Sequence, residues 1–500
     1  MTLAITYCRA HNGMEAPLVT IEVHLSAGLP GFSIVGLPEA AVREARDRVR
    51  SAILNSQYDF PQGRLTVNMA PADLPKQGGQ FDLAIALGIL AASDQLDPKA
   101  LKDYEWLAEL SLSGDLRKGP GALPAAIACQ QAGRMLVCNA DNAAEAALVT
   151  QGNVFAAEHL LQVTRMLRDP GYQLPMPDVD INPVDLAYPD LADVKGQQGA
   201  RRALEIAACG RHNLLFFGPP GTGKTLLASR LPGILPPLTN QEAVEIAAVQ
   251  SVAGLPLKWN RRPYRSPHHT ASAAALIGGG GNPKPGEVTL AHRGVLFLDE
   301  IAEFPRTVLD VLREPLESHE VCISRARRQS TFPANFQLVA AMNPTPGGYA
   351  ADDPRSNRYT REQIQKYVSR LSGPFLDRID LHIEVPSLPK EVLMANSQPE
   401  SSATVKARVT RAWQVQLQRQ GCTNSELTGK ALDQQCALGS AEHKLLDTAM
   451  DKLGLSARAY HRLLRVARTI TDLNSQPAID KSAIIEALNC RQLERLTGGG

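Results

Sequence analysis

A glycine-rich loop between an apolar run and a helix-forming run constrains this chain more than any other feature. The apolar run is Leu214 to Phe217, and the loop after it reads Gly218-Pro219-Pro220-Gly221-Thr222-Gly223-Lys224-Thr225. The pattern G-x-x-x-x-G-K-T between a strand and a helix is typical of a phosphate-binding loop. Its glycines let backbone N–H groups point at anionic oxygens. We therefore predict a nucleoside triphosphate site in which Lys224 reaches the β- and γ-phosphates and Thr225 holds Mg²⁺ through its hydroxyl.

Two carboxylates follow a second apolar run and indicate hydrolysis as well as binding. The run is 294–298, and Asp299 and Glu300 come directly after it. At the carboxyl end of a strand, Asp299 is placed to hold Mg²⁺ through water beside Thr225. Glu300 is then placed to orient and deprotonate the attacking water. A solvated strand terminus is the alternative interpretation of the pair.

Asn343 ends a third apolar run, 336–342. Taken alone, an asparagine before Pro344 is a routine turn. In the order phosphate-binding loop, Asp-Glu strand, Asn strand, we expect its amide to share the nucleophilic water with Glu300 and to report the γ-phosphate.

Composition limits the class of protein and the number of domains. At 500 residues, the chain is too long for one core. The net charge of +1 does not by itself indicate a nucleic-acid-binding protein, so a DNA-binding surface would require local patches of basic residues. The eight cysteines contain no C-x-x-C pair, which favours reduced thiols in a cytosolic protein. The absence of a signal peptide and of a membrane-length apolar run favours a cytoplasmic location and no membrane partner.

Periodicity predicts three α/β or helical units and a linker. Residues 1–168 alternate apolar runs with short helical patterns, and the proline-rich residues 169–190 read as a linker. Residues 191–395 hold the phosphate-binding loop and the short apolar runs of a buried parallel sheet with flanking helices. Residues 396–500 turn helical and read as an α-helical lid.

Long segments on both sides of these motifs resemble one protein family. They are GLPGFSIVGLPEAAVREARDRVRSAI at 28–53, RPYRSPHHTASAAALIGGGGNPKPGEVTLAHRGVLFLDE at 262–300, SGPFLDRIDLHIEVP at 372–386 and LSARAYHRLLRVARTI at 455–470. The chain resembles the AAA+ ATPases, and more closely their magnesium-chelatase-like YifB/ComM branch. The resemblance implies ATP and Mg²⁺ as cofactors, a homo-hexameric ring, and DNA as the substrate of a branch-migration motor.

The resemblance also assigns two arginines to catalysis. Arg378 looks like an arginine finger inserted into the neighbouring subunit's site, with a structural ion pair to Asp377 or Asp380 as the alternative. Arg458 looks like the lid arginine that contacts the γ-phosphate. The following arginines, at 462, 465 and 468, are expected on a solvated face.

Two insertions are candidates for gripping a substrate. Residues 320–336 read as a β-hairpin whose tip carries Arg325, Arg327 and Arg328, which would track DNA phosphates in a ring's channel. An exposed basic turn is the alternative. The segment around His268, His269 and the glycines 278–281 is expected to be flexible. A metal site there is not favoured, because adjacent histidines usually diverge and no carboxylate or cysteine accompanies them.

Other family features are altered in this chain. The N-terminal domain resembles the α+β fold of the Lon protease domain, but Gln80 stands in place of its serine and Leu123-Pro124 in place of its lysine segment. Peptidase activity is therefore not expected. Many relatives carry four cysteines after the Asn strand, where this chain has Thr345, Gly347, Asn357 and Tyr359 and so cannot hold zinc.

The leading hypothesis is an ATP-driven hexameric DNA motor. It would act as a helicase or branch-migration translocase on single-stranded and branched DNA in recombination during natural transformation, possible partners being recombination proteins. The alternative is a magnesium-chelatase-type motor that remodels a partner protein.

Overall fold

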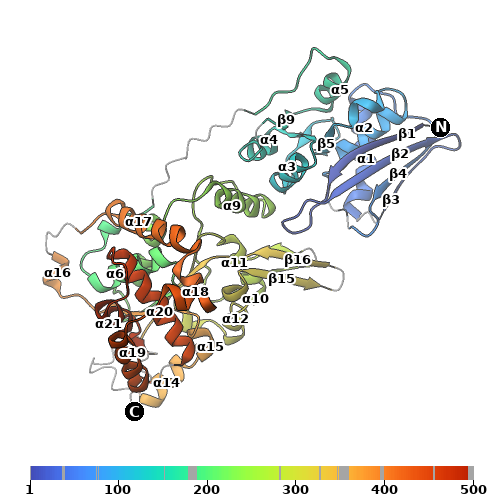
Figure 1. Ribbon diagram of the computed structural model, residues 1–500. Helices are drawn as coiled ribbons and strands as arrows, with labels where there is room; N and C mark the ends of the chain where they lie inside the picture. The colour runs from blue at the N-terminus through green and yellow to red at the C-terminus, as the bar shows by residue number, and fades with distance from the viewer. Residues whose placement is uncertain are drawn as a thin grey trace.

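The chain forms an N-terminal α+β domain, a central domain built on a parallel sheet, and a C-terminal group of helices (Figure 1). The computed structural model describes residues 2–36, 40–74, 76, 78–150, 152–177, 188–280, 283–325, 328–345, 347, 360–394, 399–453 and 456–493. In these residues, no helix combines the length and apolar character needed to cross a membrane.

The N-terminal domain holds a four-stranded mixed sheet and a three-stranded parallel sheet. The first has the order β1 (Thr2–Arg9), β2 (Leu18–Ser26), β4 (Arg64–Ala70), β3 (Gly31–Val35). The second has the order β5 (Tyr104–Leu107), β8 (Met135–Asn139), β9 (Val154–Ala157). Alternate residues of β2 are buried because α2 (Asp82–Ala92), itself wholly buried, covers one face of its sheet. The domain's last helix, α5, is Leu160–Arg168.

The central sheet has five parallel strands, of which four coincide with the predicted apolar runs and the edge strand β11 was not predicted. Their order is β11 (Tyr264–Arg265), β14 (Val295–Leu298), β17 (Gln337–Met342), β10 (Leu214–Phe217), β18 (Leu381–Glu384). Along β10, Leu214 and Phe216 pack towards α6 (Gln198–Gly210) and the C-terminal helices, whereas Leu215 and Phe217 pack towards the insertions. Burial on both faces explains why these strands show no polar alternation.

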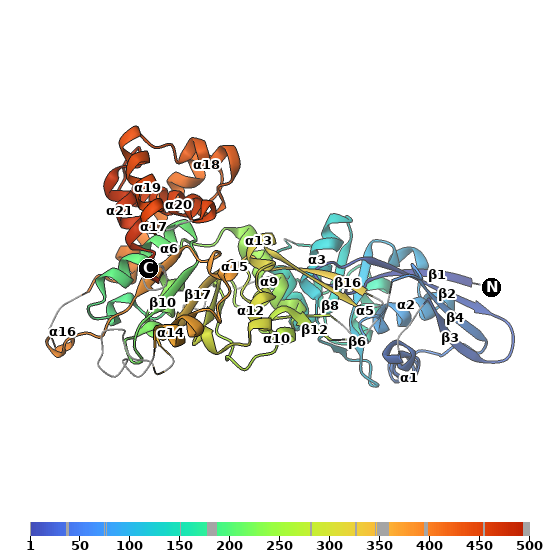
Figure 2. The same ribbon diagram turned by 90° about the horizontal axis from the view of Figure 1, so that it is seen from below.

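The two insertions are ordered against each other on one side of this sheet (Figure 2). The predicted hairpin is confirmed as β15 (Glu320–Arg325) paired with β16 (Arg328–Pro333). The segment expected to be flexible forms α10 (Ala273–Ile277) and the short pair β12 (Gly278–Gly279) with β13 (Lys284–Pro285), while Gly281 lies outside the described residues. That expectation was wrong for the described part, because the apolar side chains of α10 pack into the same cluster as the hairpin.

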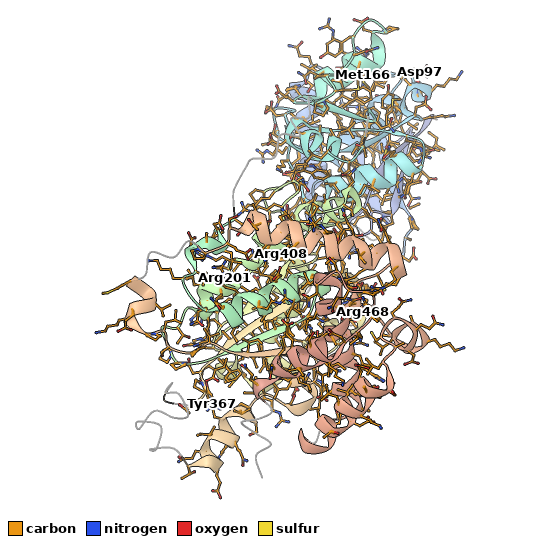
Figure 3. The ribbon with its side chains drawn as sticks, turned by 60° about the vertical axis from the view of Figure 1, so that its left-hand side comes forward. Asp97, Met166, Arg201, Tyr367, Arg408 and Arg468 are labelled. Carbon is orange, nitrogen blue, oxygen red and sulfur yellow. The ribbon has the colours of Figure 1, made fainter. Side chains whose placement is uncertain are left out.

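The C-terminal helices pack on α6 and along the amino-terminal edge of the central sheet. They comprise α17 (Ser402–Gln420), α18 (Gly429–Gln435), α19 (Ser440–Leu453), α20 (Ala457–Leu473) and α21 (Lys481–Asn489). Figure 3 shows Arg201 of α6 and Arg408 of α17 close together, and both donate hydrogen bonds to Glu400, which precedes α17.

The arginines of α20 do not form the solvated face expected from their spacing. Arg468 is only 5% exposed and donates to the carboxylate of Asp472. Arg465 donates to the carbonyl of Leu427, and Arg462 lies 3.8 Å from Asp380. The prediction failed because α20 is enclosed by α17, α21 and α6, so its charged side chains must find partners inside the protein.

The N-terminal domain contacts the central domain through the helix that carries the altered lysine segment. Leu123 of α3 (Ala122–Gln131) is buried with Ala247 and Ala248 of α9 (Asn240–Val252). The Leu123 amide donates to the Ser251 hydroxyl at 3.4 Å. Gln80 lines a neighbouring cleft of about 580 Å³, and its side-chain amide donates to the carbonyl of Arg9.

Candidate active site

The phosphate-binding loop has a backbone that only its glycines allow. Gly221 and Gly223 have φ angles of +78° and +91°, in the left-handed region that side chains disfavour. A Cβ at Gly218 would lie 2.2 Å from the carbonyl oxygen of Val385, which follows the neighbouring strand β18. The loop leads directly into α7 (Lys224–Ala228), so that the helix N-terminus faces the same space.

Lys224 is held against this loop by three acceptors. Its ammonium donates to the carbonyls of Gly218 and Pro219 at 2.7 and 2.9 Å, and to Oδ1 of Asn343 at 3.2 Å. The side chain is nearly buried, and this desolvation lowers its pKa, against the opposing charges of Asp299 and Glu300. A cation without a carboxylate partner in direct contact is suited to exchange these carbonyls for phosphate oxygens.

Thr225 and Asp299 meet as a magnesium site requires. The threonine hydroxyl donates to Oδ2 of Asp299 at 2.7 Å. Oδ1 of Asp299 accepts from the backbone N–H of Glu300 at 2.9 Å, which fixes the carboxylate at the end of β14. Hydroxyl and carboxylate oxygens are ligands that Mg²⁺ prefers, so the residues present fit this ion beside a bound polyphosphate.

Glu300 and Asn343 complete the constellation within one chain. Because β14, β17 and β10 are neighbouring parallel strands, the residues that follow them share one edge of the sheet. Glu300 adopts a left-handed backbone with φ of +49°, and its side chain is half exposed. A residue held in this sparsely populated region is a common feature of active sites. Asn343 contacts Lys224 of the loop, while its predicted roles in sharing the water with Glu300 and sensing the γ-phosphate stay predictions.

Arg378 and Arg458 are not brought to this site. Arg378 precedes β18, and Arg458 lies exposed one turn before Arg462, which contacts Asp380 at the start of the same strand. Arg378 therefore lies at the amino-terminal edge of the sheet, whereas the phosphate-binding loop follows the carboxyl end of β10. Four residues of parallel strand separate the two edges by roughly 13 Å.

Arg378 forms an ion pair, which was the alternative to its role as an arginine finger, but its partner is neither of the two aspartates expected. Arg378 binds the carboxylate of Glu317 and the carbonyl of Pro374, not Asp377 or Asp380. Asp380 instead lies 3.4 Å from His212 and 3.8 Å from Arg462, and the neighbouring imidazole and guanidinium hold its pKa down to about 2 against the effect of burial. The guanidinium of Arg378 is 9% exposed, and its Nε has no partner among the described residues.

From the sequence, His269 was not expected to contact a predicted site residue. Its Nδ1 lies 3.4 Å from Oε2 of Glu300, so a carboxylate does accompany this histidine. The rings of His268 and His269 do not diverge, because their centroids are 4.1 Å apart. The adjacency arises from the parallel pairing of β11 with β14, whose carboxyl ends lead to His269 and Glu300. Only the prediction of a strand at 264–265 could have indicated from the sequence that His269 lies near Glu300.

The remaining positions considered from the sequence are the histidines, the cysteines, the altered zinc positions and the hairpin arginines. Among the described residues, no three histidine, cysteine or acidic side chains are placed to hold a metal ion, and the eight cysteines form no disulfide. Asn357 and Tyr359 lie outside the described residues. Arg327 does too, and the side chains of Arg325 and Arg328 are not described, so the hairpin's DNA contacts stay a prediction.

Comparisons with known proteins agree with this architecture. Three family models match in order: "Subunit ChlI of Mg-chelatase" at 21–142, "Magnesium chelatase, subunit ChlI" at 190–393 and "Magnesium chelatase, subunit ChlI C-terminal" at 399–491. The competence protein ComM of Haemophilus influenzae is 52% identical, with 99% of each chain covered. The uncharacterized protein YifB of Salmonella typhimurium is 50% identical, with 99% of this chain and 98% of that protein covered.

A shorter match concerns the Lon-like expectation. Lon protease 2 of Bacillus subtilis is 28% identical over 179 residues, which is 31% of this chain and 32% of that protein. This partial likeness supports the resemblance without extending it to the whole enzyme. Full-length identity near one half and three consecutive family models establish that the chain belongs to the YifB/ComM family of magnesium-chelatase-like AAA+ proteins.

Proposed function

We propose that this protein is an ATP-driven DNA motor that works as a homo-hexameric ring in DNA recombination during natural transformation. The observation that carries the ring is the separation of Lys224 from Arg378 across the sheet. An arginine finger that cannot reach its own chain's site must act on a neighbouring subunit. The full-length relative named a competence protein supports the choice of DNA as substrate.

The described side chains support different roles for the residues of one site in the proposed reaction. Bound MgATP supplies the γ-phosphoryl group and the ion that neutralises its charge. Lys224 would exchange the carbonyls of Gly218 and Pro219 for phosphate oxygens, and Thr225 and Asp299 would hold the ion. Glu300 accepts a proton from the attacking water, and Asn343 orients that water.

The neighbouring subunit contributes the remaining charges. In a head-to-tail ring, Arg378 and Arg458 of one subunit would meet the phosphate-binding loop of the next subunit. Arg378 would leave Glu317, which is largely exposed, and stabilise the charge that develops on the transferring phosphoryl. The loop arginines 325, 327 and 328 would line the channel and contact DNA phosphates.

A mixing experiment tests the shared site. Lys224→Ala and Arg378→Ala should each be inactive alone, because each removes one half of every site. In a 1:1 mixture, about a quarter of the subunit contacts should regain both halves and restore ATPase activity. Failure of the mixture, with both variants still forming rings, would contradict the shared site.

Substrate choice is tested separately on the full-length protein. ATP hydrolysis should rise with forked duplex DNA and be coupled to its unwinding, and the Lys224→Ala protein should do neither. ATPase activity that ignores every DNA structure and responds only to a large protein partner would favour a chelatase-type remodelling motor instead.

A further inference from the structure

Two adjoining clefts form a groove at the C-terminal end of α9, the helix that lies between the N-terminal and central domains (Figure 1). The first cleft, of about 580 Å³, lies between the N-terminal domain and β13. The second cleft, of about 450 Å³, lies between Tyr188 and the residues 256–265 that lead into β11. Leu255 and Leu290 line both clefts, so the clefts adjoin there. We call the two clefts together the interdomain groove.

The unpaired charges of the interdomain groove are all basic. Lys258, Arg261 and Lys284 line it and form no ion pair with any residue in the described part of the chain. The other acidic and basic side chains of its walls are paired: Glu109 with Arg117, Lys118 with Glu145, Arg262 with Glu242 and Arg265 with Glu287. The groove therefore presents a positive charge to solvent, although the whole chain is close to neutral.

These unpaired cations are distributed along the groove. Lys284 belongs to the first cleft, and Lys258 and Arg261 belong to the second. The first cleft begins beside the hairpin, because β13 pairs with β12, and a Cβ at Gly278 of β12 would lie 2.8 Å from Cδ1 of Ile323 in β15. A free phosphate or nucleotide would occupy only one cleft. Cations in both clefts instead suit an extended polyanion that runs from the hairpin to the outer end of the groove.

The second cleft also contains a surface for stacking. The guanidinium of Arg261 lies over the ring of Tyr188, 5.0 Å from its centroid. The Tyr188 hydroxyl donates to the carbonyl of Arg262 at 3.1 Å, and the Lys258 N–H donates to Oε1 of Gln250 at 2.9 Å, so both sides of the cleft are anchored. Unstacked bases stack on guanidinium planes and aromatic rings. Cations next to such a surface favour a single nucleic-acid strand over a duplex, whose bases are already stacked on each other.

We propose that the interdomain groove binds a single strand of DNA outside the ring's channel, through phosphate contacts with Lys258, Arg261 and Lys284. The proposal rests on DNA being the substrate of the function proposed above, and it adds a second contact to that of the hairpin. The strand displaced at a fork leaves the hairpin at Lys284 and stacks a base beside Arg261 and Tyr188. Because the held strand cannot re-anneal, each ATP-driven step becomes harder to reverse.

Lysine protection tests the groove locally, since an oligonucleotide that also enters the channel would obscure a measurement of total binding. Lys258 and Lys284 are exposed, so an acetylating reagent reaches them in the free protein, and Lys444 of α19 is an exposed lysine for comparison. The full-length protein is acetylated at increasing concentrations of an oligothymidylate of about 16 nucleotides, and mass spectrometry measures each site. We expect Lys258 and Lys284 to be protected together, while Lys444 reacts at its original rate.

The salt dependence of protection shows whether phosphate contacts cause it. The logarithm of the affinity falls with the logarithm of salt concentration by about 0.7 per phosphate contact of a single strand, so three contacts predict a slope of about −2 or steeper. Arg261→Gln should make the slope measured at Lys258 shallower by about 0.7, whereas Arg261→Lys keeps the charge and should keep the slope. Lys444→Ala is the matched control and should leave it unchanged. Unfolding curves report whether each variant keeps its fold.

The outcomes separate the groove from the function on which it rests. If the protein unwinds forked DNA but the two groove lysines are not protected, or if Arg261→Gln keeps the original slope, the groove does not bind DNA and the motor stands. Protection by MgATP alone, or by ring assembly without DNA, would assign the groove to a free nucleotide or to a neighbouring subunit and overturn the proposal. Protection by the oligonucleotide in a protein that unwinds no fork would support the groove and contradict the motor.

Discussion

Lys224 and Arg378 lie at opposite edges of one parallel sheet, each held by acceptors of its own chain. Lys224 binds the carbonyls of the phosphate-binding loop, and Arg378 binds Glu317. Both side chains are almost excluded from solvent, so in the single chain each charge stays at its own edge of the sheet. This arrangement leaves the single chain with half of the charges that the proposed hydrolysis needs.

Replacement of Lys224 should remove activity and leave the fold intact. Lys224→Ala takes away the only cation in direct contact with the described loop, and we expect ATP hydrolysis to fall about 100-fold or more. Steady-state phosphate release measures the loss. The control is Lys444→Ala on the exposed surface of α19, which should hydrolyse ATP at the original rate. Equal losses in both variants would contradict a specific role for Lys224.

A methyl group at position 218 should damage the site without damaging the core. The added Cβ of Gly218→Ala would come within 2.2 Å of the Val385 carbonyl, so the loop or β18 must shift. Displacement of about 1 Å in an active site costs on the order of 100-fold in rate, and we expect a loss of that size. Gly119→Ala, where a Cβ meets no atom within 4 Å, should be neutral in the same kcat/KM assay.

The contact between the N-terminal and central domains should depend on Leu123. Leu123→Asp places a charge against Ala247 and Ala248, where the native side chain is fully buried. We expect a loss of about 3–5 kcal/mol, either from the stability of the folded chain or from the docking of the two domains. Urea unfolding and limited proteolysis of residues 169–190 would show which. Leu161→Asp, at a largely exposed position, should change neither.

Acid should destabilise the protein through His382 of β18. Burial lowers the pKa of this histidine to about 3, because the imidazolium would lose its hydration and face Arg491 and Arg462. Its pKa in the unfolded chain is about 6.5. Between these values the unfolded state binds more protons, so the free energy of unfolding falls as the pH falls, by at most about 1.4 kcal/mol per pH unit.

The contribution of His382 can be isolated by substitution. His382→Asn should lower stability at pH 7 and flatten the dependence of the unfolding free energy between pH 7 and 5. Urea titrations at several pH values measure both effects. His443→Asn, at an exposed position, should leave the slope unchanged. A His382→Asn protein with the original slope would show that other groups cause the acid sensitivity.

The predicted site residues lie close together because they follow neighbouring strands, while their catalytic roles stay a prediction. Lys224, Asp299 and Asn343 each come after a short apolar run, and parallel strands bring such positions to one edge. The arginines of α20 were misplaced for the opposite reason. Helical spacing describes which residues share a face, but the enclosure of α20 by other helices decided that Arg465 and Arg468 are paired inside the protein. The contact between His269 and Glu300 could likewise not be predicted from the local sequence pattern.

By itself, the sequence determined the phosphate-binding loop, the two carboxylates after β14, the buried strands around them and the helical C-terminal region, because each depends on spacing within one short segment. Tertiary structure alone decided the partners of Arg378 and Arg462 and the neighbour of Glu300. These relationships join segments far apart in the chain, and they are set by how strands order and helices pack. Local sequence preferences do not encode the order of the strands, because the same loop and the same arginine would have equal conformational propensities at either edge of the sheet.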